Sequence, residues 1–306
     1  MVKRMLNINT SDIWNMGKNE IIQSIKAAEG RTIVSEVVGV FPPLYGDVSN
    51  VELVSAFGAD IILLNFYDVN SPKIMGLPNE SGEKVVKEIK RLTGRFVGIN
   101  LEPVDLETET MEERIELPEG RLATPQNVQK AIKQGVDIVV LTGNPKTGVT
   151  NKKIINSIKS IRKEAGEDIL IISGKMHGAG NANETGSGII DLKTAVEFIE
   201  AGSDGILVPA PGTVPGVTLD DVKKIIDKVH SKGALAMTSI GTSQEGADEN
   251  TIRTLALNSK MAGADIHHIG DAGFTGVAIP ENIMTYSIAI RGKRHTYRRM
   301  ARSINR

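Results

Sequence analysis

Short apolar runs alternate with longer amphipathic stretches along almost the whole chain. The runs are rich in Val and Ile and are continuous, which is typical of parallel strands covered on both faces by helices. The amphipathic stretches 86–92, 151–165, 191–202 and 218–233 have the apolar spacing of helices packed on a sheet. The predicted strands cover residues 32–38, 60–66, 95–101, 137–143, 168–174, 204–210, 234–240 and 265–271.

A short repeat supports the number of strands. Gly-x-Asp occurs at 58–60, 135–137, 202–204 and 263–265, each time between a predicted helix and an even-numbered strand. Regular βα units of this kind predict an α/β protein with a (β/α)₈ fold, the TIM barrel. A doubly wound sheet is the alternative, and the regular eightfold series argues against it.

The ends of the chain differ from the repeating part. Residues 1–31 precede the first strand and predict an N-terminal helix that closes the barrel bottom, so the barrel itself covers 32–290. The C-terminal extension 291–306 carries seven Arg and Lys and no acid, in a chain whose net charge is −1. Such an arm binds nucleic acid or an anionic surface, or it clamps on the acidic body or a neighbouring subunit. Because no basic face or aromatic platform continues it, we favour the clamp and expect a homo-oligomer without nucleic acid.

Composition places the chain among ordinary globular proteins. It has 306 residues, 40% hydrophobic and 24% charged, and no cysteine. The absence of cysteine suits a reducing compartment, and we expect a cytoplasmic protein. No signal peptide and no apolar run long enough to cross a membrane are recognisable, so we expect no membrane partner.

Near the carboxyl ends of the predicted strands, polar residues occupy alternate positions, which lie on one face of each strand. This alternation is called the parity of the strand. Glu36, Asn100, Ser173 and Ser239 fall in register on the odd strands, and residues 65, 142 and 268 share that parity on even strands. Because the other parity faces apolar helices, this one should face the barrel interior. The two adjacent histidines should then face opposite sides of the last strand. We expect His268 to face the barrel interior and His267 to face the helices as a structural residue.

Three of these positions are candidates for catalysis. Glu36 lies among valines, where burial raises the pKa of a carboxyl group, and would act as a base. Lys175 would form a Schiff base, pair with Glu102 or Glu36, or bind a substrate carboxylate. His268 would transfer protons.

The loops after the strands provide binding groups. Barrels often hold phosphate in the loops after strands 7 and 8, which are rich here in glycine and hydroxyl residues. The long acidic loop 102–123 is a candidate lid over the mouth. The predicted phosphate-binding residues are Gly241, Thr242, Ser243, Gly270 and Gly273, and the predicted substrate-binding residues are Asn65, Asn100, Thr142, Asn144 and Ser239.

A divalent metal ion is the other way to use this mouth. Glu102, His177 and Asp271 are its candidate ligands, and Glu36, Asp68 or His268 would complete the set. Carboxylates favour Mg or Mn, whereas histidines with a carboxylate favour Zn, Fe or Mn. No His-x-His or His-Glu-x-x-His spacing supports this prediction.

Five segments carry a resemblance to known barrels. GVDIVVLTGNPKTGVTN, SGKMHGAGN and GADIHHIGDAGFTG together resemble an uncharacterised family of bacterial (β/α)₈ barrels. GVFPPLYGD and GADIILLNFYD are more loosely similar to BtpA-like barrels, and phosphoenolpyruvate mutase and isocitrate lyase barrels are a further analogy. The resemblance implies a phosphate-binding barrel and transfers no catalytic residue.

Three hypotheses follow. The first is a lyase, aldolase or isomerase that acts on a small phosphorylated metabolite at the barrel mouth. The second is a metal-dependent enzyme that uses the same mouth. The third is a non-catalytic barrel that binds a metabolite and signals through its basic tail.

Overall fold

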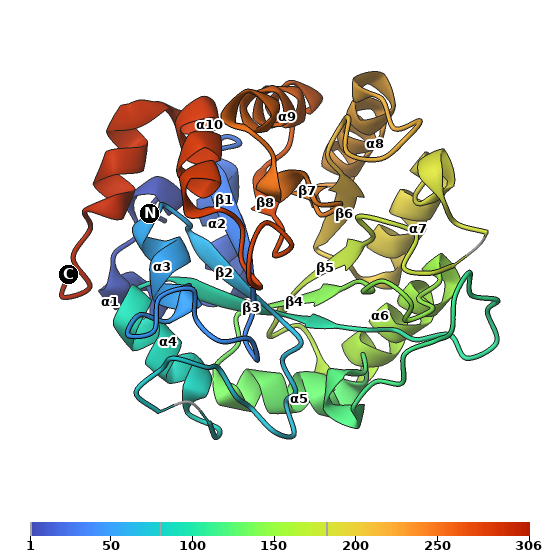
Figure 1. Cartoon of the computed structure of the whole chain (residues 1–306). Helices are drawn as coiled ribbons and strands as arrows, with labels where there is room; N and C mark the ends of the chain where they lie inside the picture. Colours follow the sequence, from blue (N-terminus) through green and yellow to red (C-terminus); the bar gives the residue numbers. More distant parts are fainter. Residues whose placement is uncertain (1, 80, 182) are drawn as a thin grey trace.

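Eight parallel strands close into a barrel in the computed structural model, which describes residues 2–79, 81–181 and 183–306 (Figure 1). Every strand pairs with its neighbours in chain order, and β1 closes the ring by pairing with β8. The predicted (β/α)₈ fold is therefore confirmed. The strands are β1 (Thr32–Val38), β2 (Ile61–Asn65), β3 (Phe96–Leu101), β4 (Ile138–Leu141), β5 (Leu170–Gly174), β6 (Gly205–Pro209), β7 (Leu235–Ile240) and β8 (Ile266–Ile269).

Helices follow the strands and form the outer layer (Figure 1). Many begin at a Thr, Ser or Asp whose side chain accepts a backbone N–H of the first turn, as Thr150 does before α6. In the described part of the chain no helix is long and apolar enough to span a membrane. The outer helices are α3 (Asn50–Ala56), α4 (Val85–Thr93), α5 (Pro125–Gln134), α6 (Asn151–Ala165), α7 (Leu192–Ala201), α8 (Leu219–Ser231), α9 (Glu249–Ala262) and α10 (Pro280–Met300).

The barrel interior is filled from below by the N-terminal segment. This segment holds α1 (Thr10–Ile13) and α2 (Lys18–Ala27). Its buried Met5, Ile21 and Ile25 belong to the same apolar cluster as the inward side chains of the strands. The closed end of the barrel is therefore packed with side chains, and a ligand has space at the opposite end.

The Gly-x-Asp repeat forms four equivalent clamps at this closed end. Each aspartate donates its backbone N–H to a carbonyl of the preceding strand, and its carboxylate accepts the backbone N–H of the same residue. Each carboxylate also pairs with a cationic side chain outside the strands. The ion pairs are Asp60–Arg291, Asp137–Lys90, Asp204–Arg162 and Asp265–His230.

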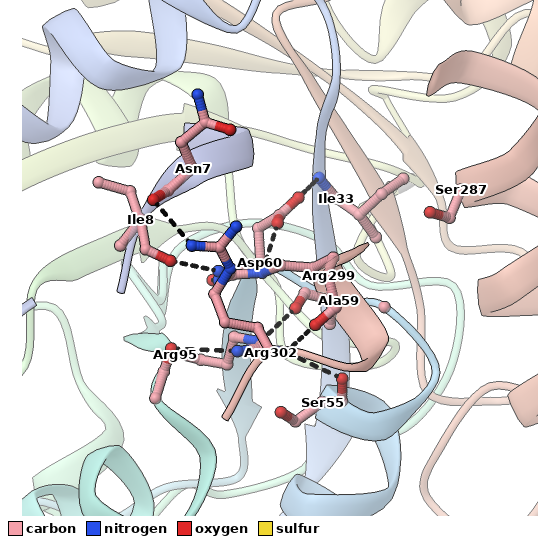
Figure 2. Close-up of polar contacts among 12 residues, drawn as sticks. Asn7, Ile8, Ile33, Ser55, Ala59, Asp60, Arg95, Ser287, Arg299 and Arg302 are labelled. Atoms are coloured by element: carbon pink, nitrogen blue, oxygen red, sulfur yellow. Dashed lines mark hydrogen bonds and ion pairs between the residues drawn. The ribbon is translucent and has the colours of Figure 1, made fainter. Parts of the chain in front are cut away.

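The clamp at Asp60 anchors the basic C-terminal segment. The last helix, α10, is kinked at Gly292. Arg291 lies 2.5 Å and Arg299 lies 2.9 Å from the Asp60 carboxylate, and all three side chains are buried. Figure 2 shows Arg299 donating to the Ile8 carbonyl, which ties both ends of the chain together. The basic arm thus packs on its own barrel as a clamp.

The predicted parity is confirmed for His268 and His267 but wrong for β5. Leu170 and Ile172 face the interior, so Ser173 faces outward and contacts the Ser203 hydroxyl at 2.7 Å. The prediction for β5 was wrong because it took the polar side chain of Ser173 as a sign of the inward face. In the structure a second serine on the helix side satisfies Ser173.

Candidate active site

A cavity of about 450 Å³ opens at the carboxyl ends of the strands. Its wall contains many of the residues that the sequence predicted, and most of them are polar. Those in the wall are Glu36, Asn65, Asn100, Thr142, Asn144, His177, Gly241, Thr242, Ser243, Gly270 and Asp271. The structure places Glu102, Lys175, Ser239, His268 and Gly273 outside the wall.

Glu36 lies at the inner end of the cavity and is held from two sides. Asn100 on β3 donates to one of its carboxylate oxygens at 2.5 Å, and Nε2 of His268 lies 3.2 Å from the other. The other ring nitrogen of His268 lies 2.6 Å from the Ser239 hydroxyl. Because His268 and Ser239 are buried beneath Glu36, they orient this carboxylate and leave it as the group that faces a ligand.

Asp271 is the second carboxyl group facing the cavity. Asn65, at the end of β2, donates to it at 2.9 Å and exchanges hydrogen bonds with the Asn144 side chain. Burial, together with the negative charges of Glu36 and Glu245, raises the pKa of Asp271 to about 7. A carboxyl group with such a pKa takes up and releases protons near neutral pH.

Glu245 is a third carboxyl group in the wall, and the sequence did not predict it. It lies in the turn after β7, is buried, and accepts the backbone N–H of Ala272 at 3.1 Å. Burial raises its pKa as well. The only sign in the sequence is a charged residue between glycines in a mouth loop, and a surface glutamate would look the same.

The acidic loop 102–123 lies over the β4 and β5 loops. Its Met111 and Glu112 line the cavity, and Glu112 forms an ion pair with Lys146 on the opposite loop. The Met111 N–H donates to the Gly180 carbonyl at 2.9 Å. The loop thus covers one side of the mouth, as expected of a lid.

Comparison with other proteins assigns a family. A family model described as a domain of unknown function matches residues 6–306. This chain belongs to the DUF7916 family. Among curated proteins no relative of this DUF7916 member was found.

A solved structure similar to this DUF7916 member is a thiamine phosphate pyrophosphorylase from Pyrococcus furiosus. The TM-score is 0.48 and the sequence identity is 13%, over 86% of this chain and 97% of that chain. The resemblance to an uncharacterised barrel family agrees with the family match. The likeness to BtpA-like and phosphoenolpyruvate mutase-like barrels remains a prediction.

Lys175 in this DUF7916 member points away from the mouth. The parity error on β5 places Met176, rather than Lys175, on the inward side, and Met176 lines the cavity. Lys175 is fully buried and forms an ion pair with Glu184 rather than with Glu36 or Glu102. Burial lowers its pKa. The predicted pairing with Glu36 or Glu102 is therefore wrong, and Lys175 holds the loop after β5 through Glu184. A Schiff base or a substrate contact at Lys175 remains a prediction.

Close packing explains why the positions predicted to hold phosphate are glycines. A Cβ on Gly241 would lie 2.1 Å from the Met176 sulfur, and one on Gly270 would lie 2.8 Å from the Ile240 carbonyl oxygen. A Cβ on Gly273 would meet the backbone of residues 278 and 279 at 2.9 Å. These positions therefore exclude side chains because protein atoms fill the space, and phosphate binding there remains a prediction.

The candidate metal ligands do not gather. Glu102 pairs with Arg121 at 2.5 Å and accepts the Asn144 backbone N–H at 2.9 Å, outside the cavity wall. His177 lines the cavity, and burial lowers its pKa to about 4, so its imidazole is neutral at pH 7. Within residues 2–79, 81–181 and 183–306, no three His, Asp or Glu side chains converge in a way that would hold a metal ion.

We expect Asp271→Asn to stabilise the fold at about pH 8. Because the folded pKa of Asp271 is raised from 3.8 to about 7, ionisation of this group costs stability as pH rises between these values. The variant should gain on the order of 2 kcal/mol at about pH 8 and almost nothing near pH 4. Urea unfolding at both pH values measures the difference. A variant that is equally destabilised at both would contradict the placement of Asp271.

Proposed function

We propose that this protein is an isomerase or lyase that transfers a proton on a small phosphorylated metabolite bound in the mouth cavity. The observation that carries the proposal is the pair Glu36 and Asp271, a buried carboxyl group on β1 and a partly buried one in the loop after β8, which face one cavity. Paired carboxyl groups in different environments are the usual basis of acid and base roles in one site.

Each carboxyl group has a role that follows from its contacts. Glu36 is held by Asn100 and His268, so its orientation is fixed, and it would remove a proton from a carbon atom of the substrate. Asp271, with a pKa of about 7, would deliver a proton to the substrate oxygen. Elimination or isomerisation of a hydroxy or oxo compound needs both steps.

The phosphate group of the substrate would lie at the rim of the cavity. The rim carries Lys146, the partly exposed Thr242 and the exposed Ser243, whereas the inner wall carries the carboxyl groups Glu36, Glu245 and Asp271. A phosphate at the inner wall would meet like charge, which costs binding free energy. Rim binding leaves the carbon end of the substrate beside Glu36.

Hydrogen exchange with solvent tests this function. The protein is incubated in D₂O with small hydroxy and oxo compounds, each as a phosphate ester and as the free form, and C–H signals are followed by proton NMR. We expect deuterium at the carbon next to the carbonyl group, faster in phosphate esters than in free forms. Ligand binding without exchange in any compound would support a non-catalytic barrel and overturn the proposal.

A further inference from the structure

Three hydrogen-bond acceptors in the inner wall of the cavity have no partner among the described residues. They are Oδ1 of Asn100, Oγ1 of Thr142 and Oε2 of Glu245. The side chains that carry them are 4%, 1% and 1% exposed. A buried polar atom without a partner costs about 1–3 kcal/mol, so such atoms call for a donor that arrives with a ligand.

The charges of the wall point the same way. Glu36, Glu245 and Asp271 face the inner part of the cavity from β1 and from the loops after β7 and β8. Among the described lining residues, Lys146 is the only Lys or Arg, and it is paired with Glu112 at the rim. Among the described residues, the wall therefore offers these carboxyl groups no other lysine or arginine, and the raised pKa values of Glu245 and Asp271 agree with that.

We infer that the inner wall binds the ammonium group of an amino-bearing, hydroxylated metabolite. Glu245 would accept the ammonium hydrogens, and Asn100 and Thr142 would accept hydroxyl hydrogens of the same molecule. The inference rests on the mouth cavity being the substrate site, as proposed above, and names the class of substrate that this site takes.

An ammonium group fits this wall better than a metal ion does. A metal ion needs several ligands converging on one point, and in the described part of the chain no three acidic or histidine side chains do so. The carboxyl groups instead come from β1 and from the loops after β7 and β8, and they are accompanied by amide and hydroxyl oxygens. Acceptors spread in this way match the several N–H and O–H donors of an amino alcohol.

Ethanolamine and ethylene glycol form a matched pair of probes, because they differ only in the ammonium group. Their dissociation constants are measured on the full chain at pH 7 by NMR titration, with Mg²⁺ alone as a third probe. We expect ethanolamine to bind at least about tenfold more tightly than ethylene glycol, since hydrogen bonds between charged groups are stronger than neutral ones.

Two variants locate the site. Glu245→Gln keeps the acceptor for the Ala272 N–H and should remove the preference for ethanolamine. Glu249→Gln removes an exposed carboxylate of α9 that lies outside the cavity wall and should leave the preference unchanged. Thermal unfolding of both variants confirms that they are folded.

Three results would overturn the inference: equal binding of the two probes, no detectable ethanolamine binding, or displacement of ethanolamine by Mg²⁺. These outcomes are independent of the exchange experiment, because binding is measured without turnover. Exchange without a preference for ethanolamine would remove the ammonium site alone. A preference for ethanolamine without exchange would remove only the proposed reaction.

Discussion

Asp60→Asn is expected to cost about 3–5 kcal/mol of unfolding free energy, because it leaves buried cations without their counter-ion. Asp60 is fully buried, and it pairs with Arg291 and Arg299, which are buried as well. Asparagine keeps the acceptor for the Ile33 backbone N–H, so the strand contact survives and the lost charge is what the experiment measures. Urea unfolding at neutral pH gives the value.

Asp265→Asn is the matched control, since the same position of the repeat carries a different partner. Asp265 pairs with His230, whose side chain is 39% exposed, so water replaces much of the lost interaction. We expect a loss of less than about 1 kcal/mol. If both variants lost the same amount, the carboxylates would act mainly through the backbone contact that they share.

Glu36→Gln should lower the rate of solvent hydrogen exchange into the substrate by about 10²–10⁴-fold, the usual contribution of a positioned base. Glutamine fills the same space and still accepts from Asn100, so the wall keeps its shape while the base is lost. The measurement is the NMR exchange assay on the compound that exchanges fastest. Glu249→Gln on the outer helix α9 should keep the wild-type rate within about twofold, because its exposed carboxylate lies outside the cavity wall.

The same variant has a readout that does not need a substrate. Burial and, after it, the negative charge of Glu36 raise the pKa of Asp271 to about 7, so Glu36→Gln should lower that pKa by the part that is due to the charge. A carbon-detected NMR titration of the Asp271 carboxyl group follows this change. An unchanged pKa would show that the two carboxyl groups do not sense each other, and the acid and base roles would lose their basis.

The fold was predictable because two signals in the sequence agree. Continuous Val and Ile runs mark strands covered on both faces, and the Gly-x-Asp repeat marks where even strands begin. Parity failed only where a polar side chain was taken as evidence of the inward face. Ser173 faces Ser203 in the helix layer, and a serine pair of this kind leaves no trace in local spacing.

The part of the site that lies on the strands was predictable from the sequence. Glu36, Asn65, Asn100 and Thr142 lie on or directly after strands, so parity placed them in the cavity wall. Glu245 lies in a loop, and its burial depends on how that turn packs against the loop after β8. Long-range packing of loops is not encoded in a periodic pattern, so sequence reasoning could not find it.

The four basal clamps divide the barrel into quarters that are alike at one end and different at the other. Five residues after each clamping aspartate, the mouth position holds Asn65, Thr142, Pro209 or Gly270, which share no chemistry. The bonds that hold the strands together thus lie a full strand length away from the residues that meet a ligand. Substitutions at the mouth can therefore change which ligand binds without weakening the contacts that stabilise the barrel. Stability and ligand specificity thus depend on different residues of the same repeat.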